Sequence, residues 1–386
     1  MSAATAVLAE RREPARATVA DAVRRRSAAF YVKIWLGGFV IASALAIGIG
    51  PYFASSLRVY EWSPQIGDYV FVPGYVHRER GEGWATTHYG QLGLATSCPA
   101  PASGARTVLV WGDSFIEAHQ VNDSQKVAAR LTEAFADRQG KTLQAIEVGH
   151  SYWSVADYYF NLPAYEKLFN PLCHFVVLAE HGLVDLCPDG ERFAAVPDFH
   201  FVQRPRVDPR KNRIMQILKA WRLEEVVLVP WKAVHNLARD VRNMHVLRKE
   251  GARGPTTHRD ELLTDRSDSN EVLASWAYVI DHLKSAATKP IVLVSVPEVP
   301  LLRDGHISLD DPQAAWNTRL ASLCRERGVG FIDMTETLLD DYRRSGKVSR
   351  GFYNGVPGRG HLNARGHYLL SERMAAYLRE HFADAQ

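Results

Sequence analysis

Apolar positions along this chain fall into short continuous runs that alternate with helically periodic segments. The runs predict buried strands at 107–111, 144–148, 174–179, 291–297 and 330–334. Amphipathic helices separate them, and a last helix follows Asn363. Buried strands separated by helices are typical of a parallel sheet covered on both faces. We therefore expect an α/β fold, a three-layer α/β/α sandwich with a mostly parallel sheet, over residues 105–386.

Residues 188–288 interrupt this alternation. They include an amphipathic helix, with apolar positions on one face between Val234 and Met244, and then a polar stretch over 251–270. We predict an insertion in the α/β domain. It serves either as a lid or partner surface or, as amphipathic helices more commonly do, as plain peripheral packing.

An uncharged apolar stretch at 34–53 precedes the strand-forming region. A helix of this length covers about 30 Å, the hydrocarbon thickness of a bilayer. Residues 1–33 carry seven Lys or Arg against three acidic residues, which predicts a cytoplasmic N-terminus and a periplasmic or extracellular domain. The alternatives are a buried helix or a signal peptide cleaved near Ala54, but the stretch begins late and runs long for a signal peptide. We expect a single-pass anchor, followed at 54–104 by a stalk or lead-in.

Charge and cysteine content narrow the function classes. The net charge is +3, and because residues 1–33 contribute +4 (7 − 3), the remainder carries −1, which argues against nucleic-acid binding. The cysteines Cys98, Cys173, Cys187 and Cys324 fit an exported domain with zero to two disulfides. Neither zinc-type Cys/His spacing nor a nucleotide-binding motif is present, so we expect no metal and no cofactor.

Candidate catalytic residues follow the predicted strands at their carboxyl ends, where open α/β sheets form their sites. Ser114 follows the first strand in "WGDSF", Gly149 follows the second in "VGHSYWS", and His361 stands just before the last helix. A serine becomes a nucleophile when an imidazole accepts its proton and N–H groups stabilise the oxyanion. We predict Ser114 as nucleophile, His361 as base, and the N–H groups of Ser114 and Gly149 as oxyanion donors.

Each of these residues also has a structural alternative. Ser114 is a favoured residue type for a helix N-cap, and Asp113 is expected to bond loop amides rather than to catalyse. His367 is a weaker alternative base, because it falls one turn inside the last helix. Glu117 and His119 are expected on the surface.

The segments "VLVWGDSF", "VGHSYWS" and "GHLNARGH" resemble the motif blocks of the SGNH/GDSL hydrolase superfamily, over roughly residues 88–187 and 289–382. The anchor and the "YGQLGL…RTVLVWGDSF" lead-in are similar to membrane-anchored members found with envelope polysaccharide assembly. The resemblance implies that Ser114 is the nucleophile and His361 the triad histidine. It also implies oxyanion donors from Ser114, Gly149 and a block III asparagine.

Two positions depart from the family pattern. Val184 stands where block III has asparagine, and Gly358 stands where an aspartate should precede the histidine by three residues. We expect the missing groups to be replaced. The candidates for orienting the imidazole are a backbone carbonyl, Asp185 and Glu180, and those for donating to the oxyanion are His150, His181 and Asn354.

The resemblance implies an exported, membrane-anchored serine esterase or O-acyltransferase that acts on envelope or exopolysaccharide carbohydrate, with acetyl as the default acyl group. Its expected partners are an acyl-ester or carbohydrate substrate, the membrane, and an envelope-assembly protein. The aromatic residues Tyr152, Trp153, Tyr158 and Tyr159 are expected either to stack on sugar rings or to pack in the core. The alternative function is a catalytically degenerate SGNH domain that binds glycan or a partner protein.

Overall fold

The computed structural model describes residues 28–95, 106–135, 143–151, 153–179, 207–220, 270–303, 306–311 and 313–382, and Lys232, His235, Ala238 and Val241 of one further helix. The chain divides into two compact units, residues 1–49 and residues 50–386.

Helix α2 (Ala28–Phe53) contains the predicted apolar stretch. Within the described part of the chain, Ala28–Ile49 is the one segment long and apolar enough to cross a membrane. It has 22 residues and a mean hydropathy of 2.0, and none of the residues in its most apolar window is buried. Its length and composition suit both a membrane span and a signal sequence.

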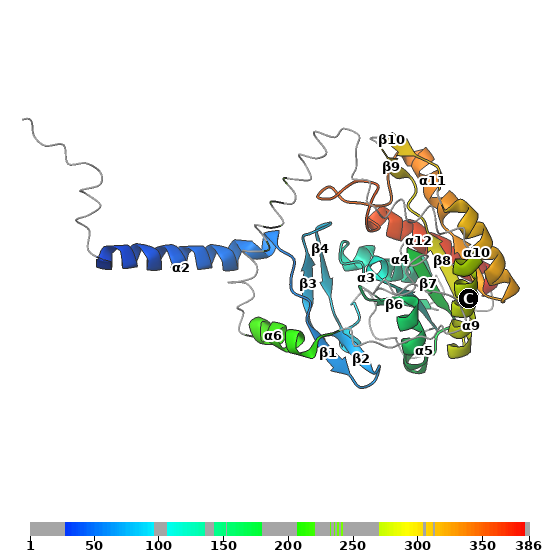
Figure 1. Cartoon of the computed structure of the whole chain (residues 1–386), viewed down its shortest axis with the longest axis horizontal. Coiled ribbons are helices and arrows are strands. Elements are labelled where there is room, and N and C mark those ends of the chain that lie inside the picture. The colour runs from blue at the N-terminus through cyan, green and yellow to red at the C-terminus, as the bar shows by residue number, and fades with distance from the viewer. Residues whose placement is uncertain are drawn as a thin grey trace, which may run out of the picture. The chain divides into compact units, whose positions relative to one another are not determined.

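Five parallel strands form the central sheet, in the order β11–β8–β7–β5–β6. Their bounds are β5 (Arg106–Gly112), β6 (Leu143–Gly149), β7 (His174–Ala179), β8 (Ile291–Val296) and β11 (Gly330–Asp333). Figure 1 labels three of them, β6, β7 and β8. Each of the five predicted strands is present. All of β7 and β8 is buried, as is β5 after its first residue, which is why these segments read as continuous apolar runs.

Helices cover both faces of this sheet, which confirms the three-layer prediction. Helix α4 packs against α12 and β6, whereas α5 packs against α9 and α9 against α10. The bounds are α4 (Val127–Ala134), α5 (Val155–Phe169), α9 (Asn270–Ala286), α10 (Ala314–Glu326), α11 (Thr335–Ser345) and α12 (Ala364–His381). The chain runs from β5 outward to β6 and then crosses back to β7, so the strand order reverses between β5 and β7. In doubly wound sheets the carboxyl ends beside this reversal form the binding site.

A buried histidine–carboxylate pair connects the layers. His174 Nδ1 accepts a hydrogen bond from Trp111 Nε1 at 3.0 Å, and its Nε2 donates to Glu166 at 2.8 Å. The Glu166 carboxylate also accepts from the Thr288 N–H, the Thr288 hydroxyl and the Lys289 N–H. These bonds join β5, α5 and β7 to the segment that leads into β8.

The lead-in is not a stalk, so that prediction is wrong for its described part, residues 54–95. Two antiparallel hairpins form there, β1 (Tyr60–Ser63) with β2 (Asp68–Phe71) and β3 (Val76–Glu79) with β4 (Ala85–His88). They belong to the same compact unit as the sheet, and Phe71, Tyr75 and Tyr89 form a small core of their own. Strands of four residues are too short to show a convincing period in the sequence.

The predicted insertion at 188–288 is too long. Helix α9, which lies inside it, is the crossover between β7 and β8. Its Trp276, Val279, Ile280 and Leu283 are buried in the main core, so the α/β sandwich resumes at Asn270. Helix α6 (Pro209–Ala220) covers the edge of β1, because the Asn212 side chain accepts from the Tyr60 N–H at 3.1 Å and donates to its carbonyl at 2.8 Å.

Candidate active site

Ser114 is separated from the end of β5 by Asp113 alone and is the first residue of the one-turn helix α3 (Ser114–Glu117). The N-cap is Asp113, whose carboxylate accepts from the Phe115 N–H at 2.9 Å. Burial raises the pKa of Asp113. Because Asp113 caps the helix, the Ser114 hydroxyl has no capping role and is available to another partner.

That partner is His361, although 247 positions separate the two residues. His361 Nε2 lies 2.9 Å from Ser114 Oγ. On the other side of the ring, His361 Nδ1 lies 2.5 Å from Glu82 Oε2, and the His361 N–H donates to Glu82 Oε1 at 3.0 Å. Both carboxylate oxygens of Glu82 therefore hold the same histidine. The three side chains form a serine–histidine–glutamate chain of hydrogen bonds.

The carboxylate determines which nitrogen of His361 carries the proton. An ionised carboxylate only accepts hydrogen bonds, so Nδ1 must be the donor to Glu82. In the neutral ring, Nε2 then has a free lone pair directed at Ser114 Oγ. This is the tautomer that a base needs to remove the serine proton. The two side chains of the pair are 24% and 28% exposed, so the site is open to small molecules in solution.

Glu82 comes from the connection between β3 and β4, outside the region where we expected the site. The hairpin is held against the His361 loop by Asn354. Its amide oxygen accepts from the Gly83 N–H at 2.8 Å, and its amide nitrogen donates to the carbonyls of Gly83 at 2.9 Å and Arg80 at 3.4 Å. The amide of Asn354 is thus engaged in positioning the hairpin, rather than in the oxyanion role predicted for it.

Two glycines with positive φ shape the loop before His361. Gly360 has φ +82°, and a Cβ there would lie 2.4 Å from Glu82 Oε1. Gly358, which replaces the expected aspartate, has φ +84° and donates its N–H to the Arg350 carbonyl at 3.0 Å. An aspartate at Gly358 would be strained, and the carboxylate comes from Glu82 instead. The sequence clue was an acidic residue between glycines, Gly81-Glu82-Gly83, at a turn between two polar strands.

Two further side chains fix the histidine loop beside α3. The Phe115 ring lies 5.1 Å from the His361 ring, and the Arg350 guanidinium covers Phe115 at 4.8 Å. Arg350 also donates to the Gly360 carbonyl at 3.3 Å and to the Pro297 carbonyl, just beyond β8, at 3.0 Å. The residue before His361 is thereby tied to the carboxyl end of the sheet.

Glu117 and His119 are buried, contrary to the prediction that they lie on the surface. Glu117 accepts a hydrogen bond from the Ser151 hydroxyl and lies 3.8 Å from Arg58 Nη2. The ammonium group of Lys126, itself fully buried, donates to the Glu117 carbonyl at 3.0 Å. Burial lowers the pKa of His119 well below its ordinary value. These contacts hold the far end of α3, three residues from Ser114.

Three of the remaining predicted site residues, Gly149, His150 and His367, lie in the described part of the chain. A Cβ on Gly149 would lie 2.3 Å from the Glu117 nitrogen, so this glycine lets α3 pack on β6, and its oxyanion role stays a prediction. His150 is buried and stacks on Trp153 at 5.5 Å. His367 is buried within α12, and burial lowers its pKa to about 3. Among the described residues, the imidazole that contacts Ser114 Oγ is that of His361. The remaining candidates, Glu180, His181 and Asp185, lie outside the described residues.

The predicted aromatic cluster largely packs in the core. Trp153 and Tyr158 are buried, and Tyr159 is half-buried against the core, so the core alternative holds for the first two. Tyr152 lies outside the described residues. Of the cysteines, Cys173 and Cys324 are buried free thiols, and burial raises the pKa of each to about 12. Cys98 and Cys187 lie outside the described residues.

No family model matches the sequence, and no curated protein is significantly similar to it. The solved structures with similarity include TesA, at 13% identity and a TM-score of 0.36 over 71% of this chain and 99% of that chain. They also include a catalytic mutant of Axe2, an acetylxylan esterase from Geobacillus stearothermophilus, at 11% identity and a TM-score of 0.35 over 73% and 95%. The α/β hydrolase LAE5 from the metagenome of Lake Arreo, Spain, has 12% identity and a TM-score of 0.37 over 72% and 96%. Identities and TM-scores this low carry no argument about function, which rests on the geometry of the site.

Proposed function

We propose that this protein is a serine esterase or O-acyltransferase of the SGNH type, with Ser114, His361 and Glu82 as its catalytic triad. The observation that carries the proposal is the continuous chain of hydrogen bonds from Ser114 Oγ through His361 to Glu82. It supplies a nucleophile, a base in the required tautomer and a carboxylate that stabilises the imidazolium.

The reaction follows from the positions of these atoms. Ser114 Oγ attacks the acyl carbonyl carbon while His361 Nε2 takes the hydroxyl proton. The tetrahedral intermediate then collapses, and its alcohol leaves with the proton from His361. Water or a sugar hydroxyl next attacks the acyl-enzyme and gives its proton to His361. As the second intermediate collapses, His361 passes this proton to Ser114 Oγ, and the acid or the new ester leaves. The N–H groups of Ser114 and Gly149 are our proposed oxyanion donors; among the described residues, no hydrogen bond occupies the Ser114 N–H.

We further propose that the acyl acceptor or ester is a carbohydrate. The support is two exposed aromatic side chains that are close in sequence to Glu82 and Asn354; the Arg80 guanidinium lies over one face of the Trp84 ring at 4.7 Å. Trp84, two residues after Glu82, is 43% exposed, and Tyr353, adjacent to Asn354, is 76% exposed. Aromatic faces stack on the apolar faces of sugar rings, and these two replace the buried cluster that the sequence suggested. Acetyl remains the acyl group implied by the family resemblance.

We propose that α2 anchors the chain with its basic N-terminus in the cytoplasm, since arginines precede the apolar stretch. The catalytic domain then faces the periplasm or the exterior. Protease added to cells with a permeabilised outer surface should digest the domain. Digestion only after lysis of the inner membrane would contradict this topology.

The alternative of a degenerate binding domain was motivated by the missing aspartate at Gly358. Glu82 supplies a carboxylate at His361 Nδ1, so the missing aspartate is a weaker reason to expect a degenerate domain. Val184, the other departure, lies outside the described residues.

The decisive experiment is turnover of an activated acetyl ester by the full chain in detergent. Ser114→Ala and His361→Ala should each lower kcat by about 10⁴-fold or more, as in other serine triads. A fluorophosphonate probe should label the wild type readily, and it should label His361→Ala slowly or not at all. The matched control is Ser322→Ala, on the solvent side of α10. Turnover by Ser114→Ala at the wild-type rate would overturn the proposal.

A further inference from the structure

The segment that follows the apolar helix runs alongside the hairpin that carries Glu82. We call residues 54–57 the exit segment, because they come directly after Phe53, where α2 ends. Ala54 and Ser56 in this segment are buried. The Ser56 N–H donates to the Arg78 carbonyl at 2.8 Å, and its hydroxyl accepts from the Arg78 N–H at 3.1 Å. The exit segment is therefore bonded to β3.

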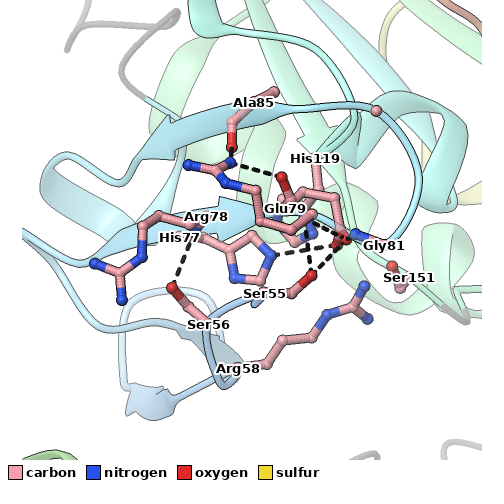
Figure 2. A network of polar contacts seen from close by, with 12 residues as sticks. Ser55, Ser56, Arg58, His77, Arg78, Glu79, Gly81, Ala85, His119 and Ser151 are labelled. Atoms are coloured by element: carbon pink, nitrogen blue, oxygen red, sulfur yellow. Dashed lines mark hydrogen bonds and ion pairs between the residues drawn. The ribbon is translucent and has the colours of Figure 1, made fainter. Parts of the chain in front are cut away.

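Ser55 extends this contact into the turn that leads to Glu82. Its hydroxyl donates to Glu79 Oε1 at 2.6 Å and accepts from the Arg80 N–H at 2.9 Å. Figure 2 shows Ser55 and Gly81 meeting the same Glu79 side chain. One side chain of the exit segment thus contacts both residues at the beginning of the turn.

Glu79 gathers the backbone of the turn onto a single oxygen. Its Oε1 accepts from the N–H groups of Arg80 and Gly81 as well as from Ser55. Burial raises the pKa of Glu79, but the nearby His77 ring, the Ser55 hydroxyl and the Gly81 N–H outweigh it and lower the pKa to about 2. The carboxylate is therefore ionised at any ordinary working pH and accepts strongly.

The other side of the turn is closed by Arg80. Its guanidinium donates to the Glu79 carbonyl at 2.6 Å and to the Ala85 carbonyl at 2.7 Å, across the neck of the hairpin. Only residues 81–84 then lie beyond the neck, and Asn354 binds Gly83 within them. Glu82 has little freedom left, because the turn is held at its base and at Gly83.

We propose that Ser55 and Glu79 are positioning residues that hold Glu82 on His361, so that the exit segment of the apolar helix is a structural part of the catalytic apparatus. This inference rests on the proposed function, since it assigns a role within the same triad. A carboxylate displaced by about 1 Å loses most of its effect on catalysis.

The test measures kcat and KM for an activated acetyl ester with the full chain in detergent. Glu79→Ala should lower kcat by about 10–100-fold, because two turn N–H groups lose their acceptor. KM should change by less than about twofold, since Glu79 does not touch the ester. Glu79→Gln should remain within about threefold of wild type, because a glutamine oxygen can accept the same three bonds that Oε1 accepts. The matched control is Glu133→Ala, an exposed carboxylate on α4.

A double variant separates positioning from general destabilisation. If Glu79 acts through Glu82, then Glu79→Ala combined with Glu82→Gln should have the kcat of Glu82→Gln alone, within about threefold. A Glu79→Ala effect of equal size in both backgrounds would overturn the inference, as would wild-type kcat in Glu79→Ala. If Glu79→Ala does not fold, Ser55→Ala takes its place, with Ser55→Thr expected to restore the rate.

Failure of the inference is distinguishable from failure of the proposed function. If Ser114→Ala and Glu82→Gln both abolish turnover while Glu79→Ala does not reduce it, only the positioning role is wrong. If Ser114→Ala and Glu82→Gln turn over the ester like wild type, the triad itself is wrong.

Discussion

Two histidine–carboxylate pairs in this protein have the same parts and different surroundings. In Glu82–His361, the carboxylate accepts from Nδ1, and Nε2 faces the Ser114 hydroxyl. In Glu166–His174, the carboxylate accepts from Nε2, and Nδ1 accepts from the Trp111 indole. The first pair is about a quarter exposed, whereas the His174 side chain is fully buried.

The difference shows what makes such a pair reactive. In both pairs the carboxylate fixes the tautomer, and the second nitrogen is left as an acceptor. Around His174 that acceptor is occupied by a fixed N–H donor, so the ring has no proton to take. Around His361 it meets a hydroxyl whose proton can be removed, at a site that solvent and substrate can reach. The partner of the second nitrogen, together with exposure, separates a candidate catalytic pair from a structural one.

The two pairs should differ most when the charge of each carboxylate is removed in turn. Glu82→Gln should lower kcat by about 10²–10⁴-fold, because the amide can hold His361 in the wrong tautomer and does not stabilise the imidazolium. Glu166→Gln should leave kcat within about twofold, since it acts far from the reacting atoms. Ester turnover with thermal unfolding of each variant measures both effects. Equal kcat losses in the two variants would end the distinction.

Stability should respond in the opposite way. Glu166→Ala removes the acceptor of His174, Thr288 and Lys289, and leaves the buried His174 N–H unpaired. We expect a loss of about 2–3 kcal/mol in the free energy of unfolding, read as a lower Tm in detergent. Glu133→Ala on exposed α4 should change it by less than about 0.5 kcal/mol. A Glu166→Ala protein with unchanged Tm would mean that the buried pair is not structural.

The smallest effect concerns acid stability. Burial lowers the pKa of His77, His119, His174 and His367, and that of His367 falls to about 3. These rings are neutral in the folded protein, whereas the unfolded chain binds protons below pH about 6.5. The contribution of these neutral rings to the free energy of unfolding is therefore fully present above pH 6.5. It is lost as the pH falls from 6.5 toward the pKa of each ring in the folded protein.

His367→Leu tests this point on one ring. The variant should lose less stability between pH 7 and pH 5 than the wild type does, by about 2 kcal/mol. His381→Gln, at the exposed end of the same helix, is the control. Parallel stability–pH curves for wild type and His367→Leu would show that His367 is not buried as a neutral ring.

The sequence predicted some parts of the site because they depend on local patterns. The strand that ends before Ser114 is a continuous apolar run, and the turn after it has polar residues at the carboxyl end of the sheet. His361 precedes a helix with a recognisable N-cap in Asn363, whose side chain accepts from the N–H groups of Arg365 and Gly366. Sheet topology then brings such strand ends to one edge.

Glu82 was beyond reach of the same reasoning. It lies in a hairpin of four-residue strands, too short for a periodic signal, and its neighbours in sequence are glycines. The family pattern directed attention to the position three residues before His361, where the turn requires glycine. The insertion boundary failed for a related reason, since α9 reveals itself as a crossover helix only by the core it covers.

The apolar helix, the five strands of the sheet and the α/β class follow from the local hydrophobic pattern, because apolar side chains must leave water. The choice of Ser114 and His361 follows from their places in the loops at the carboxyl ends of the predicted strands and from the family resemblance. The packing of whole elements places Glu82 on His361, buries Glu117 and His119, and makes the lead-in part of the folded unit. A contact between a hairpin and a loop 279 positions away depends on how whole elements pack, and no local pattern encodes it.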